Sequence, residues 1–410
     1  MFLFILTIVF CLNYSIINAT DNLRGSVLHN YSHFLRELEE SSDYIYYDGD
    51  TDVDEDESTY QFTTLFSDDD FILLPQIYTE KINTIYVDNL ITLELETEHW
   101  TKFNEFKNKY GKEYNTFEEF KTRFLIFKNN LKEINKHNLV QTFTMGINSF
   151  TDLTQYEFRS KYVIGINNGD VSLQNNNFGT CRLFNYTQIT VPDELDWRNF
   201  NAVTPVKNQG QCGSCWSFSA TGAIEGAYAI KSNVLISLSE EQLVDCSRLY
   251  GNNGCNGGLM DSAFKYTMVN GICSENDYPY TSSSGKTKYN CLKCNPVVKV
   301  HGCYDVQSND QLALKEAVSI GPVSVAIDAD TRYFQSYSSG IMDLSDCNTN
   351  LDHGVLIVGY GIENDTKYWL LKNSWGDSWG EQGYFRILRT DSDNDSGICG
   401  VAIQPSFPVI

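Results

Sequence analysis

The sequence predicts an α+β fold, and three patterns lead to that prediction. Apolar residues recur at helical spacing between Trp100 and Asn138. They do so again from Trp216 to Lys231, directly after a glycine-rich turn. Further along, Val355–Val358 is a continuous apolar run of the kind that forms a strand. Helices and strands are therefore expected in different parts of the protein.

Two helices are expected before residue 140. Aromatic residues from Trp100 to Tyr110 keep helical spacing until Gly111 breaks the run. A longer helix should follow from Thr116 to about Asn138, with one stripe of side chains along a single face. Within it, Glu119 and Arg123 are four residues apart in the order that favours an ion pair. An ordinary amphipathic helix would show the same pattern.

The stretch Gln209–Trp216 carries the strongest chemical signal. Cys215 begins the predicted helix, where the positive end of the helix dipole favours the thiolate. The alternative is a structural or redox CxxC motif, in which Cys212 and Cys215 form a disulfide, half of a zinc site or a thioredoxin-type pair. A second CxxC, Cys291–Cys294, lies too far downstream for a zinc ribbon, and the aromatic residue follows the motif rather than preceding it. We therefore interpret Cys215 as a nucleophile.

A nucleophilic thiol needs a base, and the chain offers one in a suitable setting. His353 comes directly before the apolar run at 355–358, so its ring should lie at the edge of a strand. Asn373 could then hold the ring in one tautomer. Alternatively, His353 could be a packing histidine and Asn373 a turn residue. We assume a packing role for His301, which has no motif around it.

Composition limits the classes of function. The 410 residues include 53 acidic and 30 basic ones, so binding to nucleic acid has no electrostatic support. The 12 cysteines indicate an oxidising compartment. Residues 1–19 contain a short apolar run and end in a small residue, which is typical of a signal peptide, with an uncleaved signal anchor as the alternative. Residues 20–98 include the acidic run Asp48–Glu57 and are expected to be a disordered extension.

Two motifs in residues 99–160 carry a family resemblance. The predicted long helix matches the ERFNIN signature of cathepsin L-type propeptides, and the segment after it matches the companion GNFD motif. The matching residues are Glu119, Arg123, Phe127, Asn130, Ile134 and Asn138, followed by Gly146, Asn148, Phe150 and Asp152. The resemblance implies a helical inhibitory domain at 99–160 that runs backwards through the cleft of a protease. Residues 161–190 would be an exposed linker, and cleavage there would give a mature enzyme that begins near Val191.

Residues 191–410 resemble the papain-family cysteine proteases of the cathepsin L type, most closely in pattern those of apicomplexan protozoa. The resemblance implies two lobes, a helical one carrying Cys215 and a β-barrel-like one carrying His353 and Asn373. It implies peptide-bond hydrolysis by a Cys215–His353 thiolate–imidazolium pair. Gln209 and the Cys215 N–H would hold the oxyanion.

The resemblance also implies a substrate cleft that needs no cofactor and no metal. Its lining residues would be Gly257, Gly258, Leu259, Met260, Ala326, Leu351, Gly354, Trp375, Trp379 and Gln404. Apolar or small side chains would form the S2 pocket, and Gln404 would close its end. We therefore expect a preference for Leu, Val or Phe as the second residue before the scissile bond, with weak tolerance of Arg.

The disulfides implied by the resemblance are Cys212–Cys255 and Cys347–Cys399, each stabilising by about 2–4 kcal/mol. Cys246 would pair with Cys291 or Cys294, and Cys273 with the remaining one of those two. No partner can be assigned to Cys181 or Cys303. Sequons at Asn185, Asn364 and Asn394 could accept glycans.

Three rival functions remain at this point: a binding protein on the same fold, a disulfide oxidoreductase, and an exopeptidase. The intact set of candidate catalytic residues disfavours the first. The absence of a histidine-rich loop in the sequence disfavours the last. The expected partners are polypeptide substrates, the chain's own propeptide and cystatin-like inhibitors, with the enzyme a monomer. The expected location is a lysosome-like or vacuolar compartment or the exterior, with a membrane-anchored precursor as a further possibility.

Overall fold

The computed structural model describes residues 97–139, 142–163, 165–166, 181–344 and 347–410. All of these described residues belong to one compact unit. The signal sequence expected at 1–19, and the acidic extension up to residue 96, lie outside the described residues. Among the helices that are described, none is both long and apolar enough to cross a membrane.

One mixed sheet forms the strand-rich lobe. Its β5 (Val323–Ile327) is buried at every position, and β8 (His353–Glu363) is buried until its last two residues, which explains their continuous apolar sequences. Most neighbouring strands are antiparallel, but the pairs β2–β4 and β7–β10 are parallel. The remaining strands are β2 (Arg182–Leu183), β3 (Leu195–Asp196), β4 (Gly302–Asp305), β7 (Ile341–Met342), β9 (Thr366–Lys372), β10 (Tyr384–Leu388) and β11 (Ser406–Val409).

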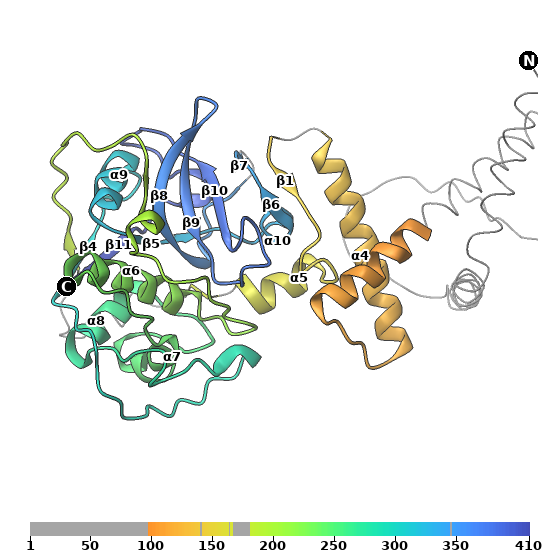
Figure 1. The fold of residues 1–410 in the computed structure, drawn as a ribbon, viewed down its shortest axis with the longest axis horizontal. Coiled ribbons are helices and arrows are strands. Elements are labelled where there is room, and N and C mark those ends of the chain that lie inside the picture. Colours follow the sequence, from red (N-terminus) through yellow and green to blue (C-terminus); the bar gives the residue numbers. More distant parts are fainter. Residues whose placement is uncertain (1–96, 140–141, 164, 167–180, 345–346) are drawn as a thin grey trace, which may run out of the picture. The chain divides into compact units, whose positions relative to one another are not determined.

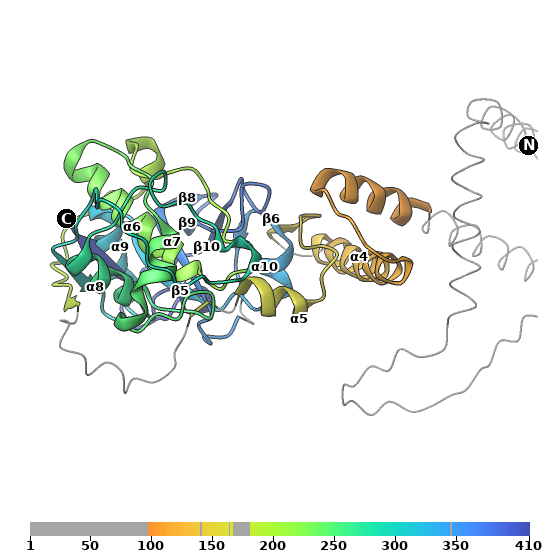
Figure 2. The same ribbon diagram turned by 90° about the horizontal axis from the view of Figure 1, so that it is seen from below.

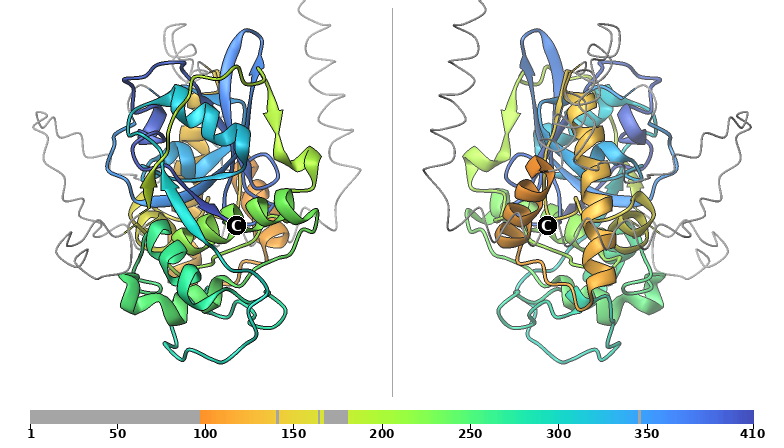
Figure 3. Two further views of the ribbon diagram at one scale, coloured as in Figure 1. Left: turned by 90° about the vertical axis from the view of Figure 1, so that its left-hand side faces the viewer. Right: turned by 90° about the vertical axis from the view of Figure 1, so that its right-hand side faces the viewer.

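The helical lobe is built from α6 (Cys215–Ser232), α7 (Glu240–Cys246) and α8 (Met260–Asn270). These helices gather on one side of the strands, and the C-terminus lies beside α6 (Figures 1 and 3). Helix α6 is largely buried because small residues on its surface let it lie close to the sheet. A Cβ at Gly222 would be 2.7 Å from Leu356 of β8. The expected division into a helical lobe and a strand-rich lobe is confirmed.

Shorter elements complete the protease domain. They are α9 (Gln311–Ile320), α10 (Arg332–Ser336) and the 3₁₀ turns η3 (Trp197–Phe200), η4 (Ser247–Tyr250), η5 (Ser282–Ser284) and η6 (Ile398–Gly400). Asp310 caps the N-terminus of α9, and its side chain accepts a hydrogen bond from the Ala313 N–H. Such capping satisfies a backbone donor that the helix itself leaves unpaired.

The described residues between 97 and 163 form a separate helical layer (Figures 1 and 2). Residues 97–110 are helical and cross α4 (Phe117–Asn138), which has the expected extent and is capped by Thr116. Their shared core is aromatic: the Phe103 ring lies 5.2 Å from Phe127. After α4 come β1 (Thr144–Met145), α5 (Gln155–Phe158) and the π-turn η1 (Arg159–Val163).

The side chains of the ERFNIN stripe hold the next segment against α4. Asn130 donates to the carbonyls of Thr151 and Leu153, at 2.8 and 2.9 Å. The ion pair expected between Glu119 and Arg123 is not the one that forms: Arg123 makes two 2.7 Å hydrogen bonds to Glu157 of α5. That partner is 34 residues away, and the bidentate geometry is stronger than a flexible pair within one helix.

This helical layer is joined to the protease domain by a small two-stranded sheet. β1 pairs antiparallel with β6 (Tyr337–Ser339). Next to it, the Gln335 amide donates to the carbonyls of Phe150 and Leu153, and Asn148 donates back to the Gln335 carbonyl at 2.7 Å. All four of these groups are buried or nearly so, so the contact is specific as well as apolar.

Five disulfides cross-link the protease domain. They are Cys181–Cys303, Cys212–Cys255, Cys246–Cys291, Cys273–Cys294 and Cys347–Cys399. The pairs left open by the sequence are thus assigned, and the two cysteines without an expected partner bond to each other. Cys212 is bridged to Cys255, so it is not a redox partner of Cys215.

A buried ion cluster lies between α6 and the sheet. Lys207 contacts the carboxylates of Glu225 and Glu240 at 3.0 and 2.6 Å, and both carboxylates are 1% exposed. Burial works against the charged amine, but the two carboxylates outweigh it and raise the pKa of Lys207. The cluster therefore depends on the lysine, because two buried carboxylates cannot remain ionised side by side.

We expect Lys207→Met to destabilise the protein by about 3–5 kcal/mol, since it removes the amine that is hydrogen-bonded to both buried carboxylates and leaves Lys372 as their nearby positive charge. Thermal unfolding of the Cys215→Ala precursor would measure this loss without self-digestion. Lys367→Met is the matched control because its ion pair with Asp391 is exposed. The control should lose less than about 1 kcal/mol. Equal losses in the two variants would contradict the role given to the buried cluster.

Candidate active site

Cys215 is the first residue of α6, as the sequence predicted, and it lies fully buried at the junction of the two lobes. It is the one free cysteine among the described residues. The Gly354 N–H donates to its sulfur at 3.1 Å. The sulfur is thus held by the opposite lobe, next to the residue that begins β8.

His353 begins β8, and its orientation is fixed by Asn373. The His353 Nε2 lies 2.8 Å from Asn373 Oδ1, which also accepts the Ser374 N–H. Because an amide oxygen can only accept, the proton of this bond belongs to Nε2. The Nδ1 lone pair is therefore free, and Nδ1 has no hydrogen-bond partner among the described residues.

Trp375 covers the His353–Asn373 hydrogen bond. Its indole lies almost parallel to the imidazole, with ring centroids 4.6 Å apart and planes inclined by 26°. Trp379 packs against its other side at 4.9 Å. Trp375 is 2% exposed and Trp379 is fully buried, so the hydrogen bond is shielded from competing water.

The two lobes meet at Gly354. A Cβ there would lie 3.2 Å from the backbone of Trp216 and 3.3 Å from the Cys215 carbonyl carbon. Strand pairing sets the position of this residue, since Gly354 is opposite Ala326 and His353 is opposite Ile327 in the β5–β8 ladder. A side chain at 354 would push α6 away from β8 and separate the thiol from the imidazole.

Gln209 is fully buried beside the thiol, and its amide is held at both ends. Its Oε1 accepts from the Ser374 hydroxyl at 2.6 Å. Its Nε2 donates to the Cys212 carbonyl at 2.9 Å and to the Tyr162 carbonyl at 3.3 Å. The donor expected to bind an oxyanion is thus already in contact with a carbonyl from the segment before residue 167.

That segment covers the thiol. A Cβ at Gly165 would lie 2.3 Å from the Cys215 sulfur, so the glycine backbone lies directly on it. The Gly165 carbonyl accepts from the Gly258 N–H at 3.0 Å, and the N–H groups of Gly165 and Ile166 donate to the Asp352 carbonyl. Ile166 forms a parallel bridge with Gly258. The segment therefore occupies the cleft by backbone pairing with both lobes.

Burial changes the charge state of the candidate pair. It raises the pKa of the Cys215 thiol to about 12 and lowers the pKa of the His353 imidazole to about 4. In this covered form both groups are neutral near pH 7. Since a thiolate is the reactive species, the covered thiol is a poor nucleophile.

Several of the residues expected to bind substrate lie in one apolar cluster with Ile166. Met260, Ala326 and Leu351 are buried in one apolar cluster, which also contains Ile166, and Leu259 packs against it. Gly257 has φ of +98°, which only glycine adopts readily, and Gly258 forms the backbone pairing with residues 165–166. Gln404 is exposed, unlike the buried residues of this cluster.

The sequence reading did not single out two groups that contribute to the site. Ser374 donates its hydroxyl to Gln209 and its N–H to Asn373, so it links two candidate catalytic side chains. The Asp352 carbonyl holds the covering segment. The role of Ser374 could have been inferred from its position between Asn373 and Trp375 in the sequence. The second is a backbone contact, which side-chain identity does not reveal.

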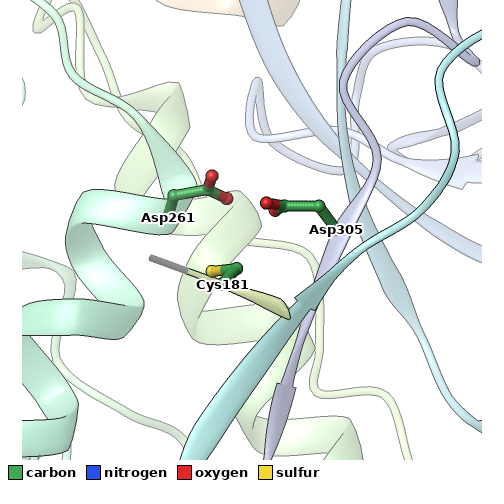
Figure 4. Close-up of side chains that lie close together, drawn as sticks. All are labelled: Cys181, Asp261 and Asp305. Carbon is green, nitrogen blue, oxygen red and sulfur yellow. The ribbon is translucent and has the colours of Figure 1, made fainter. Parts of the chain in front are cut away.

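One group of potential metal ligands occurs among the described residues: Cys181, Asp261 and Asp305 (Figure 4). The Cys181 sulfur is bonded to Cys303, so it is not available as a thiolate ligand. Burial and the neighbouring Asp261 raise the pKa of Asp305 to about 7.

Comparisons with known proteins agree with this geometry. Residues 191–409 match the papain family cysteine protease domain, and residues 103–158 match the cathepsin propeptide inhibitor domain. A germination-specific cysteine protease of Arabidopsis thaliana is 48% identical over 295 residues, which are 70% of this chain and 77% of that protein. Cathepsin L of Sarcophaga peregrina is 43% identical over 329 residues, 78% of this chain and 94% of that one.

Solved structures of precursors show the same fold. Procathepsin L 3 from the larval midgut of Tenebrio molitor superposes with a TM-score of 0.68 at 41% identity, covering 76% of this chain and 99% of that one. The proform of the ragweed pollen cysteine protease Amb a 11 gives 0.69 at 37% identity, covering 77% and 97%. The covering segment and the protease domain are thus seen together in relatives. The chain belongs to the papain family of cysteine proteases and is a cathepsin L-like zymogen with its own propeptide inhibitor domain.

Proposed function

We propose that this zymogen yields an endopeptidase in which Cys215 is the nucleophile and His353 is the general base and acid. The observation that carries the proposal is the His353–Asn373 hydrogen bond, which places the ring proton on Nε2 and leaves Nδ1 free. The free thiol of Cys215 accepts a hydrogen bond from the N–H of Gly354, the residue that follows His353. One lobe supplies the acid and the other supplies the base.

The reaction follows from these positions. Once the cleft is open to water and substrate, the Cys215 thiol transfers its proton to His353 Nδ1, giving a thiolate–imidazolium pair. The sulfur attacks the scissile carbonyl, and the oxyanion is bound by the Gln209 amide and the Cys215 N–H. As the C–N bond breaks, the imidazolium gives its proton to the leaving amine. Water, deprotonated by His353, then hydrolyses the thioester and regenerates the thiol.

The direct test of this function compares the full-length precursor with its Cys215→Ala variant. We expect the wild-type precursor to process itself and to hydrolyse peptides, and the variant to do neither, because the attacking sulfur is gone. A fluorogenic peptide assay and gel analysis of processing would measure both. Cys212 and Cys255 should be recovered as a disulfide in either protein, and reduction of substrate disulfides instead of peptide cleavage would support an oxidoreductase.

We propose that the propeptide inhibits in two ways. It occupies the cleft, where Gly165 lies on the sulfur and the Tyr162 carbonyl takes the Gln209 donor. It also excludes water, and the resulting burial favours the neutral thiol and the neutral imidazole. The second effect suppresses reactivity even toward small reagents that could reach the sulfur.

We expect Gly165→Ala to expose Cys215 in the uncleaved precursor. The added methyl would meet the sulfur at 2.3 Å, and an overpacked contact costs about 1–3 kcal/mol, which corresponds to a rise of roughly 5- to 150-fold in the open population. Alkylation of Cys215 by iodoacetamide near pH 7, followed by mass spectrometry, would measure it.

Ser160→Ala serves as the control for this variant, because Ser160 is exposed and its hydroxyl donates to the Glu157 carbonyl within the propeptide. Its alkylation rate should equal that of the wild-type precursor. An unchanged rate in Gly165→Ala would mean that residue 165 does not control access to the thiol.

The S2 pocket supports a preference for Leu, Val or Phe as the second residue before the scissile bond. Met260, Ala326 and Leu351 are buried in the apolar cluster that Ile166 of the propeptide joins. An aliphatic side chain of the propeptide therefore packs where we place the substrate side chain. Gln404, at the end of the pocket, offers no negative charge to an arginine.

We expect Gln404→Glu to improve hydrolysis of substrates with Arg at that position by about fivefold, since a partly exposed ion pair contributes roughly 1 kcal/mol. The ratio of kcat/KM for Arg and Leu substrates would measure the change. Asn364→Asp adds the same charge at the exposed turn between β8 and β9 and should leave the ratio unchanged. A wild-type enzyme that prefers Arg to Leu would contradict the assignment of the pocket.

We further propose the boundaries 99–160 for the inhibitory propeptide domain and 191–410 for the peptidase domain, with the maturation cut in the segment 161–190 that joins them. Papain-family proteases of this type are typically secretory, lysosomal or vacuolar. We place this one in a lysosome-like or vacuolar compartment or outside the cell, as a monomer that cystatin-like inhibitors can block. The Cys273–Cys294 bridge supports the similarity to apicomplexan cathepsin L-like enzymes.

A further inference from the structure

Residues 181–190 come directly before the matched protease domain, and we refer to them as the N-terminal arm. A cut at the expected position near Val191 would separate the arm from the peptidase. Among the described residues, however, the arm contacts the peptidase, namely the sheet, the C-terminal strand and α9. Four independent anchors hold it there.

The first anchor is a disulfide, and the second is a set of backbone hydrogen bonds. Cys181 forms a disulfide with Cys303 in β4. Directly after it, β2 pairs parallel with β4 and becomes the edge strand of the nine-stranded sheet. The Phe184 N–H then donates to the Asp305 carbonyl at 2.8 Å. Figure 4 shows Cys181 at the start of its strand beside the strand that carries Asp305.

The third anchor is aromatic. The Phe184 ring lies 5.4 Å from Phe407 in an edge-to-face contact and 6.3 Å from Tyr304. Phe184 and Tyr186 both pack against the main core of the peptidase. Removing the arm would expose part of this core to solvent.

The fourth anchor is a buried carboxylate. Glu316 of α9 is 3% exposed, and every hydrogen bond that reaches its carboxylate from the described residues comes from the arm. Thr187 donates its N–H and its hydroxyl, at 3.1 and 2.7 Å, and Ile189 donates its N–H at 3.3 Å. Without the arm this carboxylate would lose all of those donors, which is costly for a buried charge.

We propose that the N-terminal arm is part of the mature peptidase, so that the cut which frees the enzyme falls on the N-terminal side of Cys181. The Cys181–Cys303 disulfide pins the arm. A cut between the arm and Val191 would not release the propeptide, because the bridge would keep the cleaved segment attached. This inference rests on the proposed zymogen function only in so far as maturation occurs by proteolysis.

The test uses the full-length precursor, matured to active enzyme and examined by N-terminal sequencing and by intact mass with and without reduction. We expect a single chain that begins upstream of Cys181, whose mass on reduction changes only by the added hydrogens. A chain that begins near Val191 would overturn the proposal. So would a species that loses a fragment containing Cys181 when it is reduced.

A second measurement does not depend on the enzyme's own activity. The Cys215→Ala precursor is digested with an added broad-specificity serine protease, and the resistant core is sequenced. The core should retain the whole arm, and a core that begins at or after residue 190 would overturn the proposal. A failure of the proposed catalytic function would show separately, as wild-type enzyme without peptidase activity but with an intact arm in this digest.

The role of the disulfide is tested in the same digest with paired variants. Cys181→Ser with Cys303→Ser should let the arm be trimmed at least tenfold faster than in the Cys215→Ala parent. Cys273→Ser with Cys294→Ser removes a bridge that does not contact the arm and should leave its trimming rate unchanged. Equal trimming in both pairs would overturn the assignment of Cys181–Cys303 as the pin. If a pair fails to fold, the wild-type N-terminus still decides the main proposal.

Discussion

The close contact between α6 and β8 is the constraint on which the rest of the structure depends. Gly354 permits it, because any side chain there would meet the backbone of Trp216 and Cys215. The same residue donates its N–H to the sulfur, so one glycine sets both the distance between the lobes and the position of the thiol. The small residues of α6 allow the same close approach. The buried Lys207 contacts Glu225 of α6 and Glu240 of α7 and so joins these two helices.

The inhibitor makes use of groups that also suit a substrate. Gly258, Asp352 and Gln209 all form hydrogen bonds with residues 162–166. Trp375, which shields the His353–Asn373 bond, also donates its indole N–H to the Tyr162 carbonyl. A propeptide that binds in this way needs no groups in the cleft other than those proposed to bind substrate. Outside the cleft it makes a second set of contacts, through the small sheet formed with β6 and through Gln335.

The sequence was sufficient to predict the fold class, the two expected helices, Cys215 at a helix N-terminus and His353 at the start of a strand. These features depend on short patterns or on motifs. The sequence reading did not predict the Arg123–Glu157 pair or the Cys181–Cys303 bridge. Each joins segments far apart in the chain, and their meeting is decided by packing that no local pattern encodes. Ser374 lay inside a recognised motif, but its two hydrogen bonds become visible only when Gln209 and Asn373 are brought together.

The distribution of cross-links has a consequence for the lifetime of the two parts. All five disulfides lie at or after residue 181, and residues 20–180 contain no cysteine. After cleavage the inhibitor is stabilised by its aromatic core and ion pairs without any disulfide, whereas the peptidase is cross-linked by five disulfides. In a compartment rich in proteases we therefore expect the inhibitor to be degraded sooner than the peptidase. Inhibition can therefore be ended by digestion of the inhibitor, without any need to weaken its binding beforehand.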